Sequence, residues 1–204
     1  MARPRFHRLP AEQQRAIMAA ALEEFAAHGF AAASLNRIID AAGISKGSMY
    51  YYFDGKDDLY ADVIRMQLEQ LLEHSGPISV PDPADADAFW SELEGLYLRL
   101  MRRLGETPET AALLRGWLTG SGGPSLREAE QEATEATTPW LLQTIEAGQR
   151  VGAVRTDLAA DLIIALAMGM GQAMDSWLIT RPPADLDSAI ATLMSTMRRA
   201  LSPL

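Results

Sequence analysis

Apolar residues recur at helical spacing along almost the whole chain. In the segment 84–104, for example, Phe89, Leu93 and Leu96 return every three or four residues, which places them on one face of a helix. No stretch alternates apolar and polar residues over about six positions, the pattern that a half-buried strand would show. β-Branched residues are sparse, whereas the helix formers alanine, leucine, glutamate and arginine are common. The pattern predicts an all-α fold.

Capping residues and glycines divide the first third of the chain into four expected helices. Ser34 and Ser45 stand where a hydroxyl can cap the helix that follows. Gly29 and Gly43 can supply the left-handed backbone that ends a helix. Pro10 suits a first helical position because its missing N–H would be unpaired there anyway. The expected spans are residues 10–29, 35–42, 46–52 and 56–74.

Residues 75–87 are rich in proline, glycine and aspartate and form the clearest linker in the chain. Beyond it, Ser125 and Glu128 have the spacing of a capping box, and Asp157 is placed to cap the next helix. Pro139 is expected to kink the helix that contains it. The expected spans are 84–104, 109–119, 125–148, 158–179 and 185–201, with a loop at 120–124, which makes about nine helices in all.

Charge is distributed unevenly along the chain. The net charge of the whole chain is -9. Up to Phe53, however, six basic side chains stand against four acidic ones, which leaves twelve basic and 23 acidic side chains in the remainder. A weakly basic head on a strongly acidic body predicts that only the head meets a polyanion such as DNA.

Several classes of chemistry lack the residues they need. The chain contains no cysteine, and its histidines, His7, His28 and His74, are too scattered for a helical ligand pair, so we expect no metal site and no cofactor. No acid, base or nucleophile constellation points to an enzyme. The longest apolar run, 162–171, is shorter than the roughly 20 residues of a membrane helix, and no apolar segment follows the first arginines as it would in a secretory signal. The expected location is the cytoplasm, with no membrane partner.

The segment 34–53 has the layout of a helix-turn-helix. Two short expected helices flank a turn at 42–45, and apolar residues such as Ile38, Ile39 and Met49 can be buried between them. The second of these helices then presents Lys46, a small residue at Gly47, and tyrosine hydroxyls, all suited to contacts with DNA phosphates and base edges.

These residues carry a resemblance to a known family. From Gly43 to Leu59 the chain follows the order G-[IV]-S-x-G-x-[LM]-Y-x-[HY]-F-x-x-K-x-x-L, and the stretch 15–65 resembles the DNA-binding domain of the TetR family of transcriptional regulators. The resemblance implies an all-helical homodimer with an N-terminal three-helix DNA-binding domain. It places that domain at 1–55, a connecting helix and linker at 56–80, and a ligand-binding and dimerisation domain at 81–204.

The resemblance also implies which residues meet DNA. Ser34 and Lys56 stand at helix N-termini, where free N–H groups favour a phosphate. Arg37 is added as a DNA contact, with a solvated surface arginine as the alternative. The candidate DNA-binding residues are Ser34, Arg37, Lys46, Gly47, Ser48, Tyr50, Tyr51 and Lys56. Arg3, Arg5 and Arg8 are expected either to form a flexible arm that reaches the minor groove or to be disordered and only attract DNA by their charge.

The acidic body holds all four tryptophans and most of the methionines. These residues fit either a plain hydrophobic core or a pocket for a small, largely apolar or aromatic effector that is neutral or cationic. The candidate ligand-binding residues are Trp90, Tyr97, Met101, Trp117, Trp140, Gln143, Met170 and Met174.

The last two helices are expected to form a four-helix interface with a second copy. In the helix after Asp157 the bulky side, with Ile163, Leu166 and Trp177, is assigned to the protomer's own core, and the small-residue side to the partner. The candidate interface residues are Leu158, Leu162, Ala165, Gly169, Gln172, Ala173, Ser176, Ile190, Met194 and Met197.

The sequence as a whole predicts a transcriptional regulator, specifically a repressor that a small molecule releases from a two-half-site DNA operator. The alternative is a dimeric DNA-binding regulator that has no small-molecule inducer.

Overall fold

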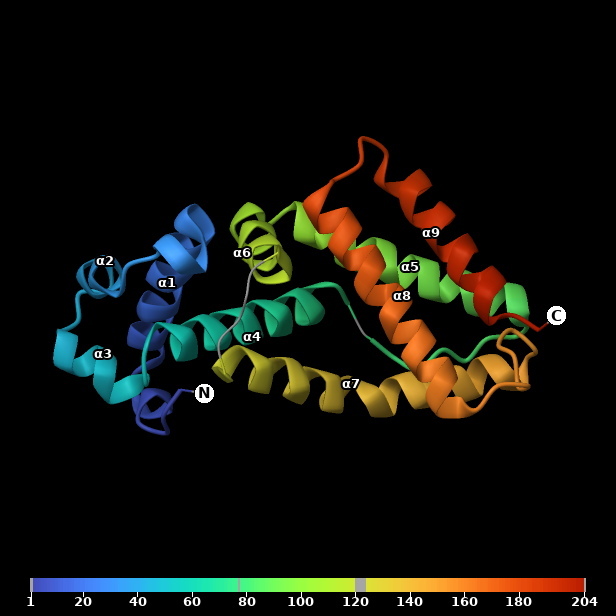
Figure 1. Cartoon of the computed structure of the whole chain (residues 1–204), viewed down its shortest axis with the longest axis horizontal. Helices are drawn as coiled ribbons and strands as arrows, with labels where there is room; N and C mark the ends of the chain where they lie inside the picture. The colour runs from blue at the N-terminus through green and yellow to red at the C-terminus, as the bar shows by residue number, and fades with distance from the viewer. Residues whose placement is uncertain (1, 77, 120–123, 204) are drawn as a thin grey trace. The chain divides into compact units, whose positions relative to one another are not determined.

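The computed structural model describes residues 2–76, 78–119 and 124–203. Within these residues the fold is all-α, as predicted, with nine α-helices, one short 3-10 helix and no strand (Figure 1). Residues 120–123 of the expected loop lie outside the described residues. The elements are η1 Phe6–Arg8, α1 Ala11–Ala32, α2 Leu35–Ala41, α3 Lys46–Tyr52, α4 Lys56–His74, α5 Ala86–Gly105, α6 Pro108–Thr119, α7 Pro124–Arg150, α8 Ala160–Thr180 and α9 Leu186–Leu201.

The chain divides into two compact units. Unit 1 comprises Met1–Leu71 and Leu104–Ala133, and unit 2 comprises Leu72–Arg103 and Thr134–Leu204. This division differs from the expected one at residue 80, because α6 and the first part of α7 belong to the same unit as the helix-turn-helix.

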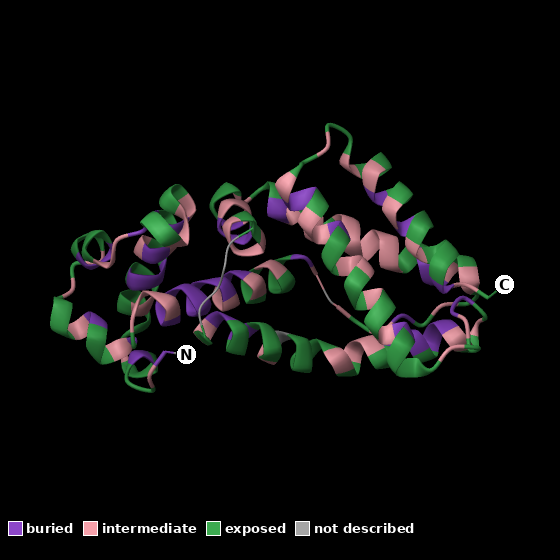
Figure 2. Cartoon of the chain, viewed as in Figure 1, coloured by how far each residue is buried: buried purple, intermediate pink, exposed green. Residues whose placement is uncertain are grey.

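In unit 1, α1 packs against both α2 and α6. The core gathers fully buried side chains from α1 and α4, and Figure 2 shows the buried stretch along α4. Tyr60 stacks edge-on against Phe25 at 4.8 Å between ring centroids and lies 5.0 Å from Phe30. A buried hydrogen bond of 2.5 Å from Thr110 Oγ1 to Gln67 Oε1 ties α6 to α4. These contacts join α1, α4 and α6 into the base on which the helix-turn-helix packs.

The helix-turn-helix forms as its local sequence predicts. Ser34 Oγ accepts the backbone N–H of Arg37 at 3.4 Å, and Ser45 Oγ accepts that of Ser48 at 3.0 Å, so both serines cap the helices that follow them. Gly43 adopts a positive φ of 64° between α2 and α3, a conformation that costs other residues about 1–2 kcal/mol. Gly29 also has a positive φ, 67°, but it interrupts α1 before its last turn and does not end it.

In unit 2 the core forms around Phe89 on α5, Ile163 on α8 and Ile190 on α9, all almost completely buried. Arg102 with Asp187, and Arg198 with Asp87, form ion pairs of 2.5 Å that join α5 to α9. The backbone of α7 approaches the core closely at Gly148. A Cβ there would lie 2.6 Å from Val154 Cγ2 and 2.7 Å from Phe89 Cζ, so no side chain fits without displacing these two.

Two expected caps of the second half are wrong. The guanidinium of Arg155 binds Asp157 at 2.6 and 2.7 Å, and α8 begins later, after Ala159, without a side-chain cap. Ser125 lies inside α7, and its N–H donates to Asp57 Oδ2 at 3.0 Å. Asp157 is held by the neighbouring Arg155 and does not cap α8, and Ser125 cannot cap a helix in which it already lies. Asp185, by contrast, caps α9 as expected, accepting the N–H of Ser188 at 3.0 Å.

Candidate functional site

The outer surface of α3 is exposed, whereas its inner surface belongs to the core. Met49 on α3 and Ile38 on α2 are buried, which fixes how the helix sits on unit 1. Lys46 is exposed, and the side chains of Tyr50 and Tyr51 are 46% and 48% exposed. Large aromatic side chains so exposed on a small helix are available to a partner.

The first turn of α3 carries no bulky side chain at Gly47 and Ser48. A Cβ on Gly47 would have only Ser45 Oγ near it, at an ordinary 3.7 Å, and no positive φ requires glycine at this position. The protein's own packing therefore does not explain why this surface is small. Ser48 is half-buried, and its Oγ lies 2.9 Å from Ser45 Oγ. The small first turn leaves room for another backbone or a groove wall to approach α3.

Arg37 makes a structural ion pair. Its Nε donates to both carboxylate oxygens of Glu24 at 2.9 Å, and its Nη2 donates to Glu24 Oε1 at 2.5 Å and to Ala32 O at 3.1 Å. Glu24 also accepts the N–H of Ser34 at 2.7 Å. The guanidinium thus joins α1 to the start of α2. This bidentate pairing occupies most of the donors that could otherwise bind DNA.

Lys56 is also occupied within the protein. Its ammonium donates to the carbonyls of Ala31 and Ala33, each at 3.1 Å, and lies 4.8 Å from the ring centroid of Phe30. These carbonyls are the unpaired acceptors at the C-terminal end of α1, where a cation is favourable. The exposed candidates that remain for DNA are therefore Lys46, Gly47, Tyr50 and Tyr51, and the helix cap Ser34 is half-buried.

The ion pair predicts how stability depends on pH. The Arg37 guanidinium is the main cause that lowers the pKa of Glu24, helped by the N–H of Ser34, although burial opposes the shift. A carboxyl with a lowered folded-state pKa stabilises the fold above its unfolded-state pKa, and this contribution is lost as the pH falls through the folded-state pKa. We therefore expect Glu24→Gln to melt at a lower temperature than the parent at pH 7.

The difference in melting temperature between the parent and Glu24→Gln should shrink as the pH is lowered below about 4.5, because the unfolded parent then binds a proton at Glu24 while the folded parent still holds this carboxyl ionised. Thermal unfolding followed by circular dichroism at several pH values measures it. A difference that stays constant across this pH range would show that the charge of Glu24 contributes nothing.

The expected flexible arm of arginines is wrong, because the first residues are ordered. Phe6 is buried, with its ring centroid 5.0 Å from that of Phe53. The N–H of Arg3 donates to Tyr52 O at 2.9 Å, and the side chain of Arg3 forms an ion pair with Asp54. These contacts were not predictable from composition, which showed only a short basic segment.

The structure does not gather the eight candidate ligand residues around one cavity. Trp117 belongs to unit 1, where its Nε1 donates to Glu130 at 2.8 Å. Trp90 and Met174 are buried in the core of unit 2, and Trp90 Nε1 donates to Ala153 O at 3.3 Å. Tyr97 and Met101 pack against the same core, Met170 is half-buried, and Gln143 is exposed.

The hydroxyl of Tyr97 donates to Asp175 Oδ1 at 2.5 Å, which joins α5 to α8. Burial raises the pKa of the Asp175 carboxyl, and the same burial, with the neighbouring carboxylate, raises the pKa of Tyr97. No other partner of this carboxylate is seen within the part of unit 2 that the structure describes.

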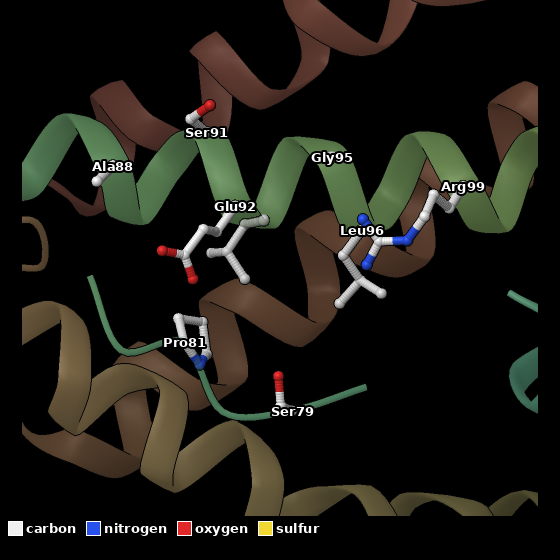
Figure 3. Close-up of a pocket in the computed structure, with 9 residues that line it drawn as sticks. Ser79, Pro81, Ala88, Ser91, Glu92, Gly95, Leu96 and Arg99 are labelled. Atoms are coloured by element: carbon white, nitrogen blue, oxygen red, sulfur yellow. The ribbon is translucent and has the colours of Figure 1, made fainter. Parts of the chain in front are cut away.

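A groove of about 410 Å³ lies elsewhere in unit 2, along α5 (Figure 3). Figure 3 shows Glu92, Leu96 and Arg99 on the side of α5 that faces Pro81 and Ser79 of the linker. Trp140 borders this linker, because its Nε1 donates to Ser79 O at 3.2 Å. Sequence reasoning missed the groove because its lining is mixed in polarity, and the polar linker gave no sign that it folds back along α5. The lining residues are Ser79, Pro81, Ala88, Ser91, Glu92, Leu93, Gly95, Leu96 and Arg99.

The surface of α8 differs in part from the expected division into a core side and an interface side. Ile163 and Met174 are buried as assigned, but Leu166 and Trp177 are 39% and 41% exposed. On the interface side, Leu162, Ala165, Gly169, Gln172 and Ala173 are exposed, whereas Leu158, Ser176 and Met197 are half-buried. Ile190 and Met194 of α9 are buried in the protomer's own core, so neither is available to a second copy.

The helix α8 is long and apolar enough to cross a membrane by length and composition, which the run of ten apolar residues did not indicate. Only 22% of its most apolar window is buried. Among the described residues, no group of three or more acidic or histidine side chains is placed to hold a metal ion.

Comparisons with known proteins agree with this geometry. The family model described as "Bacterial regulatory proteins, tetR family" matches residues 17–63, which span α2, α3 and most of α1. The HTH-type transcriptional repressor SCO4008 of Streptomyces coelicolor is 31% identical over 85% of this chain and 81% of its own length. The HTH-type transcriptional activator FasR of Mycolicibacterium smegmatis is 26% identical over 91% of this chain and 82% of its own length.

The fold is also similar to that of solved structures. The crystal structure of the transcriptional regulator FadR from Bacillus subtilis, in complex with stearoyl-CoA, superposes with a TM-score of 0.68 over 94% of this chain and 100% of that one, at 17% identity. The helix-turn-helix, the all-α architecture and the similarity to SCO4008 along most of both chains lead to one conclusion. The chain belongs to the TetR family of bacterial regulatory proteins.

Proposed function

We propose that this regulator is a cytoplasmic repressor that acts as a homodimer on a two-half-site operator and is released by a small molecule. The observation that carries the proposal is the geometry of the capped helix α3. Its outer surface exposes Lys46, Gly47, Tyr50 and Tyr51, while Met49 on its inner surface is buried. A helix of this kind enters the major groove, and two copies read half-sites one helical turn apart. Its cation and hydroxyls suit phosphate contacts, and its small first turn suits close approach to the bases.

The exposed apolar surface of α8 supports the homodimer. Leu162, Leu166 and Met168 are 46%, 39% and 36% exposed, and such a surface on a water-soluble regulator needs a cover. Small residues at Ala165 and Gly169 on this surface let a second helix come close. Gln172 interrupts the apolar surface with a polar group, a mixture more typical of a protein interface than of a lipid-facing helix. The partner proposed for this surface is a second copy of the chain.

The groove along α5 supports an effector site in unit 2. Leu93, Leu96 and Pro81 give it apolar surface, and Glu92 and Arg99 add charges of both signs. The fold itself accommodates an acyl ligand in the FadR structure, although 17% identity carries no ligand over to this chain. A largely apolar molecule with one polar end fits these lining residues best.

The chain itself links the groove to the helix-turn-helix and so offers a route by which ligand binding can affect DNA binding. The groove residues of α5 lead to Gly105, where that helix ends, and α6 begins at Pro108. Within unit 1, α6 packs on α1 and reaches α4 through the buried Thr110–Gln67 hydrogen bond. A ligand that favours one arrangement of α5 would in this way bias the base on which α3 sits.

A fluorescence titration tests the effector, and Trp140 is its reporter because its indole donates to Ser79, which lines the groove. The probes are a panel of aromatic and long-chain alkyl compounds, titrated with and without an operator selected from random-sequence duplex DNA. A true effector should change the Trp140 emission, and DNA should lower its affinity by the same factor, about 5- to 150-fold, by which it lowers the affinity for DNA.

Trp140→Phe is the control, because it should remove the signal while operator release, followed by anisotropy, persists. If operator binding is strong but no probe changes either emission or DNA affinity, the chain is the dimeric regulator without a small-molecule inducer. If the parent selects no DNA sequence at all, the regulator proposal itself fails.

A further inference from the structure

The ordered N-terminal segment lies against the end of the recognition helix α3. Phe6 packs its ring against Phe53 and, at 6.2 Å between centroids, against Tyr52. The backbone of Arg3 donates to Tyr52 O at 2.9 Å, and its Nη1 donates to Tyr50 O at 3.2 Å. Segment 2–9 is therefore fixed to the carbonyl end of α3, and its arginines have defined positions beside the surface proposed to meet DNA.

The three arginines of this segment have different surroundings. Arg3 is committed to the protein, because it binds Asp54 and a carbonyl of α3. Arg5 and Arg8 are exposed, and no carboxylate pairs with either of them among residues 2–76, 78–119 and 124–203. Together with Pro4 the three arginines line an open concavity of about 540 Å³. A concavity lined by two uncompensated guanidinium groups is suited to an anion.

Arg5 has one further contact, with the ring of Tyr51, and this contact orients its guanidinium. The guanidinium carbon of Arg5 lies 4.2 Å from the ring centroid of Tyr51, which is itself 48% exposed. A guanidinium held over an aromatic ring is stabilised by cation–π attraction, while the N–H groups at its edge remain free to donate. The ring also reduces the rotamer freedom that a long side chain would lose on binding.

We propose that Arg5 and Tyr51 form a composite phosphate-binding unit that contacts the DNA backbone beside the half-site. The guanidinium donates to a backbone phosphate, and the ring of Tyr51 positions it. Tyr51 is thus a positioning residue, while Lys46 and Tyr50 contact the DNA themselves. This inference rests on the proposed DNA-binding function, and it adds the N-terminal segment to the interface as a fixed part in place of a mobile arm.

The simpler alternative is that Arg5 only adds diffuse positive charge, and it predicts a different result. A diffuse charge would need no particular neighbour, so replacing Tyr51 would leave the contribution of Arg5 unchanged. A guanidinium held by the ring gives the opposite expectation, namely that the two replacements are strongly non-additive.

The test is a double-mutant cycle on operator binding. The probe is a duplex of roughly 30 base pairs, long enough for two half-sites, selected with the parent protein from a random-sequence library. Arg5→Ala should weaken binding about tenfold, the effect of losing a charged hydrogen bond, and should reduce the slope of log affinity against log salt by about 1 per half-site. Tyr51→Ala should weaken binding similarly in the parent but by less than about twofold in Arg5→Ala.

Three further variants make the result specific. Tyr51→Phe keeps the ring, so Arg5→Ala should weaken binding and reduce the salt slope as much in Tyr51→Phe as in the parent. Arg150→Ala removes the same charge from the exposed end of α7 and should change neither. Lys46→Ala should lower the affinity in every background, which shows that the assay detects a lost phosphate contact. Circular dichroism checks that each variant is folded.

Two outcomes would overturn the proposal while leaving DNA binding intact. An unchanged salt slope in Arg5→Ala would show that its guanidinium meets no phosphate. Equal losses for Tyr51→Ala with and without Arg5 would show that the tyrosine acts on DNA independently. If the parent and Lys46→Ala bind every duplex equally weakly, the DNA-binding function fails first, and this inference fails with it.

Discussion

Replacing Gly169 with leucine is expected to convert the dimer to monomers and, with that, to abolish tight operator binding. Within the protomer a Cβ at Gly169 meets nothing within 4 Å, so the protomer should fold as before. At the proposed α8 interface the added side chain has no room, and overpacking costs about 1–3 kcal/mol at each site. A two-fold interface contains the change twice, so the dimer should lose about 2–6 kcal/mol.

Analytical ultracentrifugation measures the dimerisation, and fluorescence anisotropy with the selected operator measures the binding. Ala136→Leu is the control, since it places a leucine at an exposed position on α7 outside the proposed interface. It should remain a dimer with the affinity of the parent. A Gly169→Leu protein that is still a dimer would remove α8 from the interface, and a monomer that keeps full operator affinity would contradict the two-half-site arrangement.

The second large effect is expected at the recognition helix. Gly47→Leu should bind operator DNA at least 30-fold more weakly, because two blocked helices per dimer each lose about 1–3 kcal/mol where α3 approaches the groove. The protein should nevertheless be as stable as the parent or more so. The nearest atom to a Cβ is Ser45 Oγ at 3.7 Å, and leucine in a helix is favoured over glycine by up to about 1 kcal/mol.

Stability and DNA affinity should respond differently to Gly47→Leu, and each can be measured. Thermal unfolding should show a melting temperature no lower than that of the parent, while anisotropy shows the loss of DNA binding. Gly105→Leu serves as the control, because that glycine is exposed at the end of α5 and a Cβ added there would meet nothing within 4 Å. Operator affinity that survives Gly47→Leu would mean that the first turn of α3 does not face the DNA.

Much of the DNA-binding half could be predicted from the sequence because its signals are local. A capping serine, a glycine with positive φ and an apolar residue such as Met49 each act within a few residues, so Ser45 and Gly43 define α3 wherever the rest of the chain lies. The family order of residues from Gly43 to Leu59 depends on the same short-range geometry. For this reason the positions of α2, α3 and α4 agree with expectation almost to the residue.

The partners of the charged residues in the DNA-binding half could be identified only from the tertiary structure. The sequence marks Arg37 and Lys56 as cations near helix starts, which is equally compatible with a phosphate contact and with an internal one. Only the fold brings Glu24 to Arg37 and the last carbonyls of α1 to Lys56. A long cationic side chain binds the nearest uncompensated acceptor, and residues distant in sequence supply that acceptor.

The sequence by itself determined the helices, the helix-turn-helix and the family, because periodicity, caps and turns are properties of neighbouring residues. The tertiary structure decided which apolar surfaces stay free. The helix α8 has apolar residues on more than one side, and α9 has a single apolar stripe. Periodicity cannot tell which apolar surface meets the protomer's own core and which meets a partner. Packing buried Ile190 and Met194 and left Leu166 and Trp177 exposed. The same holds for the groove along α5 and for Arg5 over Tyr51, since each depends on segments that meet only when the chain folds.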